Sequence, residues 1–108
     1  PASWRERFPS AEAEYTARNP EPDFDGLVTG CVTMWTDPDG YPGEAVAQIS
    51  APLTIVRGAD DPLTSHTMAV ELQRLVPQAE LIEIDDAAHA VAATHPTRVA
   101  EIIRAALG

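Results

Sequence analysis

Cysteine and long apolar runs are the two features that this sequence most clearly lacks. Cys31 is the single cysteine, so no disulfide forms within the chain, which favours a reducing compartment and predicts a cytoplasmic location. No apolar run approaches the roughly 20 residues that a transmembrane helix needs. The sequence therefore predicts neither a disulfide-stabilised domain nor a membrane span.

Basic residues are also scarce, with 7 against 17 acidic residues and a net charge of −10. A surface of this charge repels nucleic-acid phosphates and anionic lipid headgroups, and no cluster of basic side chains provides a local exception. We therefore expect partners that are neither nucleic acid nor membrane.

The two halves of the chain differ in composition. Residues 1–50 contain six of the ten prolines and both tryptophans, whereas residues 51–108 follow regular apolar patterns. The 108 residues suffice for one small domain. The chain begins with Pro1 in place of methionine, which favours a piece of a longer protein.

Only short elements are predicted in the first half. A helix over 11–18 follows Ser10, a residue type that caps helices, and Pro20 ends it. Residues 21–26 are expected to be a loop, and residues 27–35 fit either a strand or a buried turn of helix. A turn over 37–40 and a short helix over 44–48 complete this half.

The second half predicts strand, helix, strand and helix. Apolar runs over 53–56 and 80–84 are typical of buried strands. Between them, Thr64 or Ser65 caps a helix whose buried face is expected to hold Met68, Leu72, Leu75 and Val76. A last helix starts at Pro96, with an apolar face made of Val99, Ile102, Ile103, Ala106 and Leu107.

A helical connection makes the two strands parallel, so residues that follow both strands meet at one edge of the sheet. The first of these loops contains Asp60 and Asp61, and the second contains Asp85, Asp86 and His89. A carboxylate can hold an imidazole in one tautomer while the other ring nitrogen takes a proton from a nucleophile, which makes this edge a candidate catalytic site. Two strands alone cannot cover their own edges, and we expect other strands, from outside this sequence or from a swapped copy, to complete the sheet.

Residues 49–107 resemble the closing segment of the α/β-hydrolase superfamily. The shared pattern is an apolar strand, Gly-x-x-Asp, a helix, Pro-x-Ala before a strand, a small residue before His, and a proline seven positions later. Its places are occupied here by Gly58, Asp61, Pro77, Ala79, Ala88, His89 and Pro96. The resemblance implies an α/β fold, with residues 51–108 as the C-terminal part of the hydrolase core and residues 1–50 as a lid or cap.

The resemblance also implies that Asp61 is the catalytic acid and His89 the catalytic base. Asp60 is then a solvated neighbour, or it is the catalytic acid itself if the alignment with the family pattern is shifted by one residue. Two positions depart from the family pattern: Ala88 stands where relatives often have glycine, and Thr94 where they often have glutamate.

The nucleophile that the superfamily carries on a G-x-S-x-G-type turn is missing from the sequence. Cys31 has small residues, Thr29 and Thr33, two places to either side. A nucleophile turn must be followed by a helix, however, and the DPDG turn comes too soon after Cys31 to allow one. A buried structural cysteine is the better interpretation. In the assumed lid, Trp4 and Phe8 lie one helical turn apart and would pack within it or over a substrate pocket.

The family implies hydrolysis of an ester, a lactone or a similar acyl compound, with the nucleophile supplied from outside the chain. A narrower resemblance, over residues 36–52 and the Ala-Ala-His at 87–89, is to 3-oxoadipate enol-lactonases. The alternative is a non-catalytic fragment or a binding or structural subunit, because the fold alone does not decide function. No cofactor or metal is expected, since His66, His89 and His95 lack the spacing of a zinc pair and no nucleotide-binding motif is present.

Overall fold

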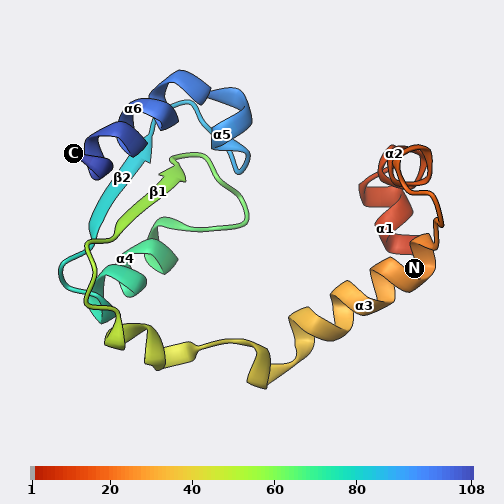
Figure 1. The fold of residues 1–108 in the computed structure, drawn as a ribbon, viewed down its shortest axis with the longest axis horizontal. Coiled ribbons are helices and arrows are strands. Elements are labelled where there is room, and N and C mark those ends of the chain that lie inside the picture. Colours follow the sequence, from red (N-terminus) through yellow and green to blue (C-terminus); the bar gives the residue numbers. More distant parts are fainter. Residues whose placement is uncertain (1) are drawn as a thin grey trace. The chain divides into compact units, whose positions relative to one another are not determined.

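The computed structural model describes residues 2–108, and Pro1 lies outside the described residues. Two compact units are present, one ending at Pro42 and the other spanning Gly43–Gly108 (Figure 1). The sequence places its boundary near residue 50, whereas the 3-10 helix η2 (Gly43–Gln48) packs against the second unit through the helix α4 (His66–Leu75). No helix among residues 2–108 is long and apolar enough to cross a membrane.

The N-terminal unit is helical: α1 (Ala2–Arg7), α2 (Ala11–Arg18), α3 (Phe24–Thr36) and a 3-10 turn, η1 (Pro38–Gly40). The predicted helix over 11–18 is confirmed, although the Ser10 side chain makes no capping hydrogen bond. The expectation of a loop over 21–26 is wrong in part, because Asp23 caps α3 by accepting a hydrogen bond of 2.9 Å from the backbone N–H of Gly26. Residues 27–35, open between strand and helix in the sequence, are therefore helical.

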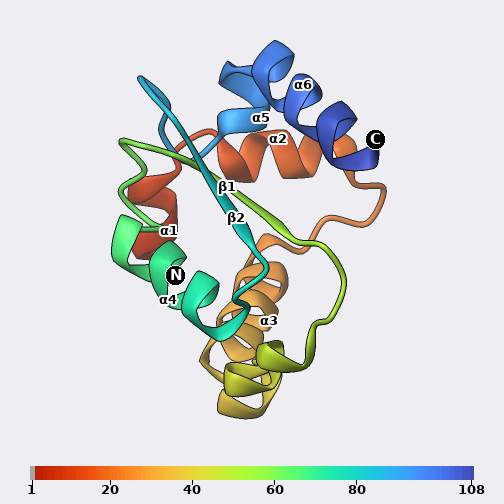
Figure 2. The same ribbon diagram turned by 90° about the vertical axis from the view of Figure 1, so that its left-hand side faces the viewer.

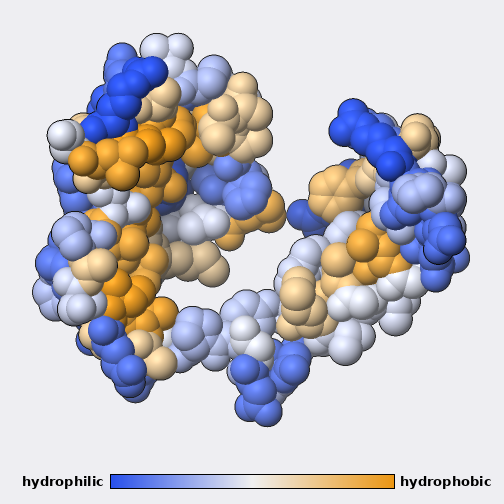
Figure 3. Space-filling view, viewed as in Figure 1, coloured by the Kyte–Doolittle hydropathy of each residue, from blue (hydrophilic) through white to orange (hydrophobic). Residues whose placement is uncertain are grey.

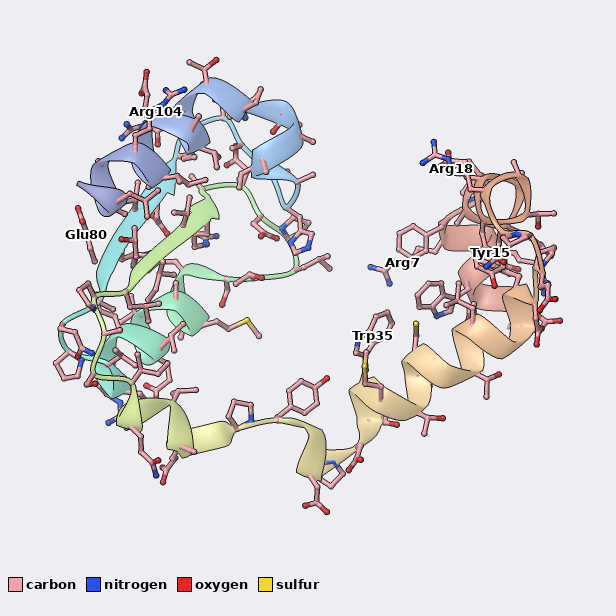
Figure 4. All side chains as sticks on the ribbon, viewed as in Figure 1. Arg7, Tyr15, Arg18, Trp35, Glu80 and Arg104 are labelled. Carbon is pink, nitrogen blue, oxygen red and sulfur yellow. The ribbon has the colours of Figure 1, made fainter. Side chains whose placement is uncertain are left out.

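Charged and aromatic side chains hold these helices together. The Arg5 guanidinium pairs with Glu12 at 2.6 Å and with Asp25 at 3.0 Å, so it links α1 to α2 and α3. Trp4 stacks on Trp35 with ring centroids 5.5 Å apart. Trp35, which projects from α3, remains half-exposed (Figure 4). The unit thus has a small core and keeps aromatic surface accessible.

The C-terminal unit is built on two parallel strands, β1 (Thr54–Gly58) and β2 (Glu80–Ile84), which pair in register from Thr54↔Glu80 to Gly58↔Ile84. The helices α4 and α6 (Pro96–Leu107) lie on opposite faces of the strands (Figures 1 and 2). The predicted order and the parallel pairing are both confirmed. A short helix, α5 (Val91–Thr94), replaces part of the loop expected after β2, since this alanine-rich segment favours helix.

The core of this unit lies between the sheet and α6, where Ile84, Ala87 and Ile102 are buried against Val56 and Ile82. Two predicted helix faces are only partly buried. On α4, Ala69 is buried whereas Met68 is exposed, and Val76, which follows the helix as its C-cap, is buried. On α6, Ile103 and Leu107 are exposed, at 53% and 83%.

The exposed residues of α6 belong to an apolar groove of about 470 Å³ that also includes Pro52, Leu53 and Val56. Figure 3 shows hydrophobic surface gathered beside this helix. Pro52 and Leu53 precede β1, so the groove lies toward the end of the strands opposite to Asp61 and His89, which follow the strands. Its position therefore suits a packing surface better than a substrate pocket.

Candidate active site

Two loops meet closely where the strands end. Backbone hydrogen bonds join them, from Ala59 N–H to the Ile84 carbonyl at 2.9 Å and from Asp60 N–H to the Ala87 carbonyl at 3.0 Å. A Cβ atom on Gly58 would lie 2.2 Å from the carbonyl oxygens of both Ala87 and Ala88. Only glycine allows this approach, so the main chain itself holds the two loops together.

The loop after β1 folds around the carboxylate of Asp61. Its Oδ1 atom accepts hydrogen bonds from the backbone N–H groups of Leu63 at 2.8 Å and Thr64 at 3.0 Å. Pro62, between Asp61 and Leu63, restricts the backbone to the turn geometry that such an arrangement needs. The side chain is only 4% exposed, and its second oxygen, Oδ2, is left for another donor.

His89 supplies that donor. Its Nδ1 atom lies 3.0 Å from Oδ2 of Asp61, while the imidazole is 58% exposed. Asp86, at φ 54°, turns the chain after β2 in the left-handed region that aspartate tolerates, and His89 follows three residues later. Asp60 makes no side-chain hydrogen bond within the C-terminal unit, so the structure places Asp61, and not its neighbour, against the histidine.

The hydrogen bonds around Asp61 determine the protonation of the pair. Desolvation raises the pKa of Asp61, but the backbone hydrogen bonds from Thr64 and Leu63 and the contact with His89 together lower this pKa below its ordinary value. The carboxylate is then ionised at neutral pH and can only accept a hydrogen bond, so Nδ1 of His89 carries the proton. In the neutral imidazole, Nε2 is left as the proton acceptor, which is what a general base requires.

This lowered pKa predicts an acid-dependent stability. A carboxyl group with a lower pKa in the folded state stabilises the fold above its unfolded-state pKa, of about 3.9, and this contribution disappears as the pH falls through the folded-state pKa. We expect Asp61→Asn to lower the free energy of unfolding at pH 7 and to flatten its decline below about pH 4. Urea unfolding between pH 7 and pH 2 measures this, with Asp60→Asn as the matched control. The prediction would be contradicted if the free energy of unfolding fell with decreasing pH equally steeply in the two variants.

The other candidate residues lie apart from this pair. Cys31 is in the middle of α3 and not at a strand-to-helix turn, so it does not have the local geometry of a nucleophile in this fold. His66 contacts Glu83 at 2.8 Å, and His95 contacts Thr94 at 2.8 Å. Among residues 2–108, no group of three or more His, Cys, Asp or Glu side chains is arranged to hold a metal ion.

One charged residue near the site is not identified by the sequence patterns above. Arg57 is 6% exposed on β1 and forms an ion pair with Glu83, the residue directly opposite on β2. The signal available in the sequence was a pair of opposite charges, Arg57 directly after the predicted strand over 53–56 and Glu83 within the predicted strand over 80–84. Reading it requires the register of the strands, which apolar patterns do not supply.

Comparison with known proteins gives one informative likeness. No family model matches the sequence, and no curated protein matches it. The crystal structure of E-2-(acetamidomethylene)succinate hydrolase, an α/β-hydrolase, is similar over 58% of this chain, with a TM-score of 0.55 and 25% sequence identity. The match covers 24% of that longer chain. The likeness supports a partial α/β-hydrolase fold within that superfamily, and does not extend to a particular member of it.

Proposed function

Given a partial α/β-hydrolase fold, we propose that this chain supplies the acid and the base of a nucleophile–His–Asp hydrolase that cleaves esters, lactones or related acyl compounds. The observation that carries the proposal is the 3.0 Å contact between Nδ1 of His89 and Oδ2 of Asp61, on the loops that follow two parallel strands. The solved α/β-hydrolase that resembles this chain acts on a compound with an acetamido group, so acyl chemistry is compatible with this fold.

The proposed mechanism uses the free nitrogen of the imidazole. Nε2 of His89 takes the proton of the nucleophile as it attacks the acyl carbon, and the imidazolium then returns this proton to the leaving group. Asp61, held by Leu63 and Thr64, keeps Nδ1 protonated and stabilises the positive charge that forms on the ring. The exposed imidazole edge is the side from which nucleophile and substrate approach.

The nucleophile and the remaining strands would come from outside these 108 residues. Within Gly43–Gly108, no hydroxyl or thiol hydrogen-bonds to His89. The two strands have outer edges that pair with nothing in this unit, and the groove beside Ile103 and Leu107 leaves an apolar face uncovered. A second polypeptide, a longer chain or a swapped copy that extends the sheet would bury these groups and bring a nucleophile to the base.

We extend the proposal to the N-terminal unit, which would act as the lid of the assembled hydrolase. Its helices keep Phe8, Met34 and Trp35 about half-exposed although these are large apolar side chains. Such side chains are typical of surfaces that cover an apolar ligand or another part of a protein.

A covalent probe for activated serines tests the proposal. A fluorophosphonate should add to the hydrolase that contains this chain, and intact-mass measurement followed by peptide mapping should locate the adduct outside residues 1–108. His89→Ala should slow the labelling by about 10²-fold or more, because the base activates the nucleophile. Labelling at an equal rate in the variant, or no labelling at all, would instead favour a non-catalytic binding or structural subunit.

A further inference from the structure

Arg57 is a charged residue of β1 that is almost fully buried, with 6% of its surface exposed. Its guanidinium donates hydrogen bonds to two backbone carbonyls of the loop that follows β1. Nε lies 3.0 Å from the Thr64 oxygen, and Nη2 lies 3.4 Å from the Ala59 oxygen. These two carbonyls stand on either side of Asp61, so one planar group spans the segment that presents the carboxylate.

The remaining guanidinium nitrogen of Arg57 forms an ion pair with Glu83, which balances the buried positive charge. Nη1 pairs with its Oε1 atom, and the same oxygen lies 2.8 Å from Nδ1 of His66 at the start of α4. The hydrogen bond with His66, followed by that with Arg57, lowers the pKa of Glu83 below its ordinary value. Glu83 is therefore ionised at neutral pH, and the buried positive charge has a fixed partner.

Thr64 connects this cluster to the proposed acid. Its backbone N–H donates to Oδ1 of Asp61 at 3.0 Å, and its carbonyl accepts from Nε of Arg57 at 3.0 Å. A displacement of Thr64 away from Arg57 would remove a donor from the carboxylate. An apolar residue at position 57 would fill the same place without the cost of burying a charge, so general stability does not by itself explain an arginine there.

We propose that Arg57 is a positioning residue, which fixes the loop of residues 59–64 so that Leu63 and Thr64 keep the Asp61 carboxylate hydrogen-bonded and aligned with His89. The inference rests on the proposed function for its catalytic meaning, since Asp61 matters to catalysis only if His89 acts as the base. Arg57 itself makes no hydrogen bond or ion pair with either of these side chains within the C-terminal unit. Its effect is transmitted through the backbone of Thr64.

The test uses the 108-residue chain and does not depend on hydrolysis. The variant Arg57→Met/Glu83→Gln removes the guanidinium without leaving an unpaired charge, and Arg74→Met/Glu71→Gln removes an exposed Arg–Glu pair of α4 as the matched control. NMR measures amide hydrogen exchange at Leu63 and Thr64 and the pKa of the Asp61 carboxyl group. We expect exchange at the two amides to become about tenfold faster or more, because the loop opens locally. The pKa of Asp61 should rise toward its ordinary value, and the control should change neither quantity.

Three results decide the outcome. Faster amide hydrogen exchange in the loop alone, with the β2 amides still protected from exchange, supports the proposal. Unchanged exchange in the loop and an unchanged pKa of Asp61 in a folded variant overturn it. If the double variant unfolds, Arg57→Lys replaces it, because an ammonium group can pair with Glu83 but cannot bond Ala59 and Thr64 at once. Global loss of protection in both variants would overturn the proposal and make Arg57 a residue of general stability.

Activity data separate this inference from the proposed function. In the assembled hydrolase, Arg57→Lys should lower kcat with little change in KM, since Arg57 is buried and would act on Asp61 through the loop. If His89→Ala leaves activity unchanged, the proposed function fails, although the exchange measurement can still show that Arg57 positions the loop. If Arg57 variants leave the loop unchanged, the further inference fails while the proposed function stands.

Discussion

Replacing His89 by alanine should lower kcat of the assembled hydrolase by about 10²-fold to 10⁴-fold, which is the usual contribution of a general base. The reason is the arrangement of the pair: Nδ1 of the imidazole lies 3.0 Å from Oδ2 of Asp61, so Nε2 is the nitrogen left to accept the proton of the nucleophile. Steady-state kinetics with an activated ester measure the effect, with KM expected to change little because His89 acts on the nucleophile and not on substrate binding.

His95→Ala is the matched control for this experiment. His95 contacts Thr94 at 2.8 Å and makes no hydrogen bond to Asp61 or His89, so its loss should leave kcat within a factor of a few. Imidazole added to the His89→Ala variant should restore part of the activity by supplying the missing base. If the His89→Ala variant keeps activity within tenfold of the wild type, His89 is not the general base.

Gly58→Ala should be the most damaging small substitution in the C-terminal unit. The added methyl group would lie 2.2 Å from two backbone carbonyl oxygens, of Ala87 and Ala88, and neither can rotate away as a side chain could. We expect a loss of about 3 kcal/mol or more in the free energy of unfolding, at the upper end of what overpacking costs. Relief of the clash would push apart the loops that carry Asp61 and His89, so kcat should fall as well. Urea unfolding monitored by circular dichroism measures the first effect.

Gly30→Ala provides the matched control, because a Cβ atom at this position of α3 meets nothing within 4 Å. Alanine in a helix interior is favoured over glycine by roughly 0.5–1 kcal/mol, so this variant should be slightly more stable than the wild type. A Gly58→Ala variant with wild-type stability would show that the two loops do not approach as closely as the structure has them.

Periodicity in the sequence was enough to predict the regular elements of the C-terminal unit. The strand over 80–84 and the helix that starts at Pro96 lie where their apolar patterns place them. The predicted first strand covers 53–56, whereas β1 runs from Thr54 to Gly58. The apolar pattern stops at Val56 because Arg57 is polar and glycine disfavours strands. Helical periodicity also predicts Met68 on the buried face of α4, whereas in the structure Met68 is exposed and Ala69 is buried. A small residue such as alanine lets the helix approach the sheet closely.

The candidate site was only partly accessible to sequence reasoning. Asp61 and His89 could be paired because loops at the carboxyl ends of parallel strands must meet. The role of Gly58 depends on its close approach to the distant backbone of Ala87 and Ala88. The role of Arg57 depends on where its side chain meets Ala59, Thr64 and Glu83. No local sequence pattern contains either arrangement. For α3, the capping by Asp23 decides the helix, and the apolar run of residues 27–35 alone is compatible with a strand.

The two-stranded sheet also has a consequence for the colloidal behaviour of the chain. Within the described residues, β1 and β2 each pair on one side only, and an open strand edge is a template for cross-β growth with other copies. At pH 7 the net charge of −10 opposes such contacts by mutual repulsion. This repulsion vanishes near the isoelectric point of about 4.4, so mildly acidic solutions are where fibrils or precipitates of the chain should form most readily.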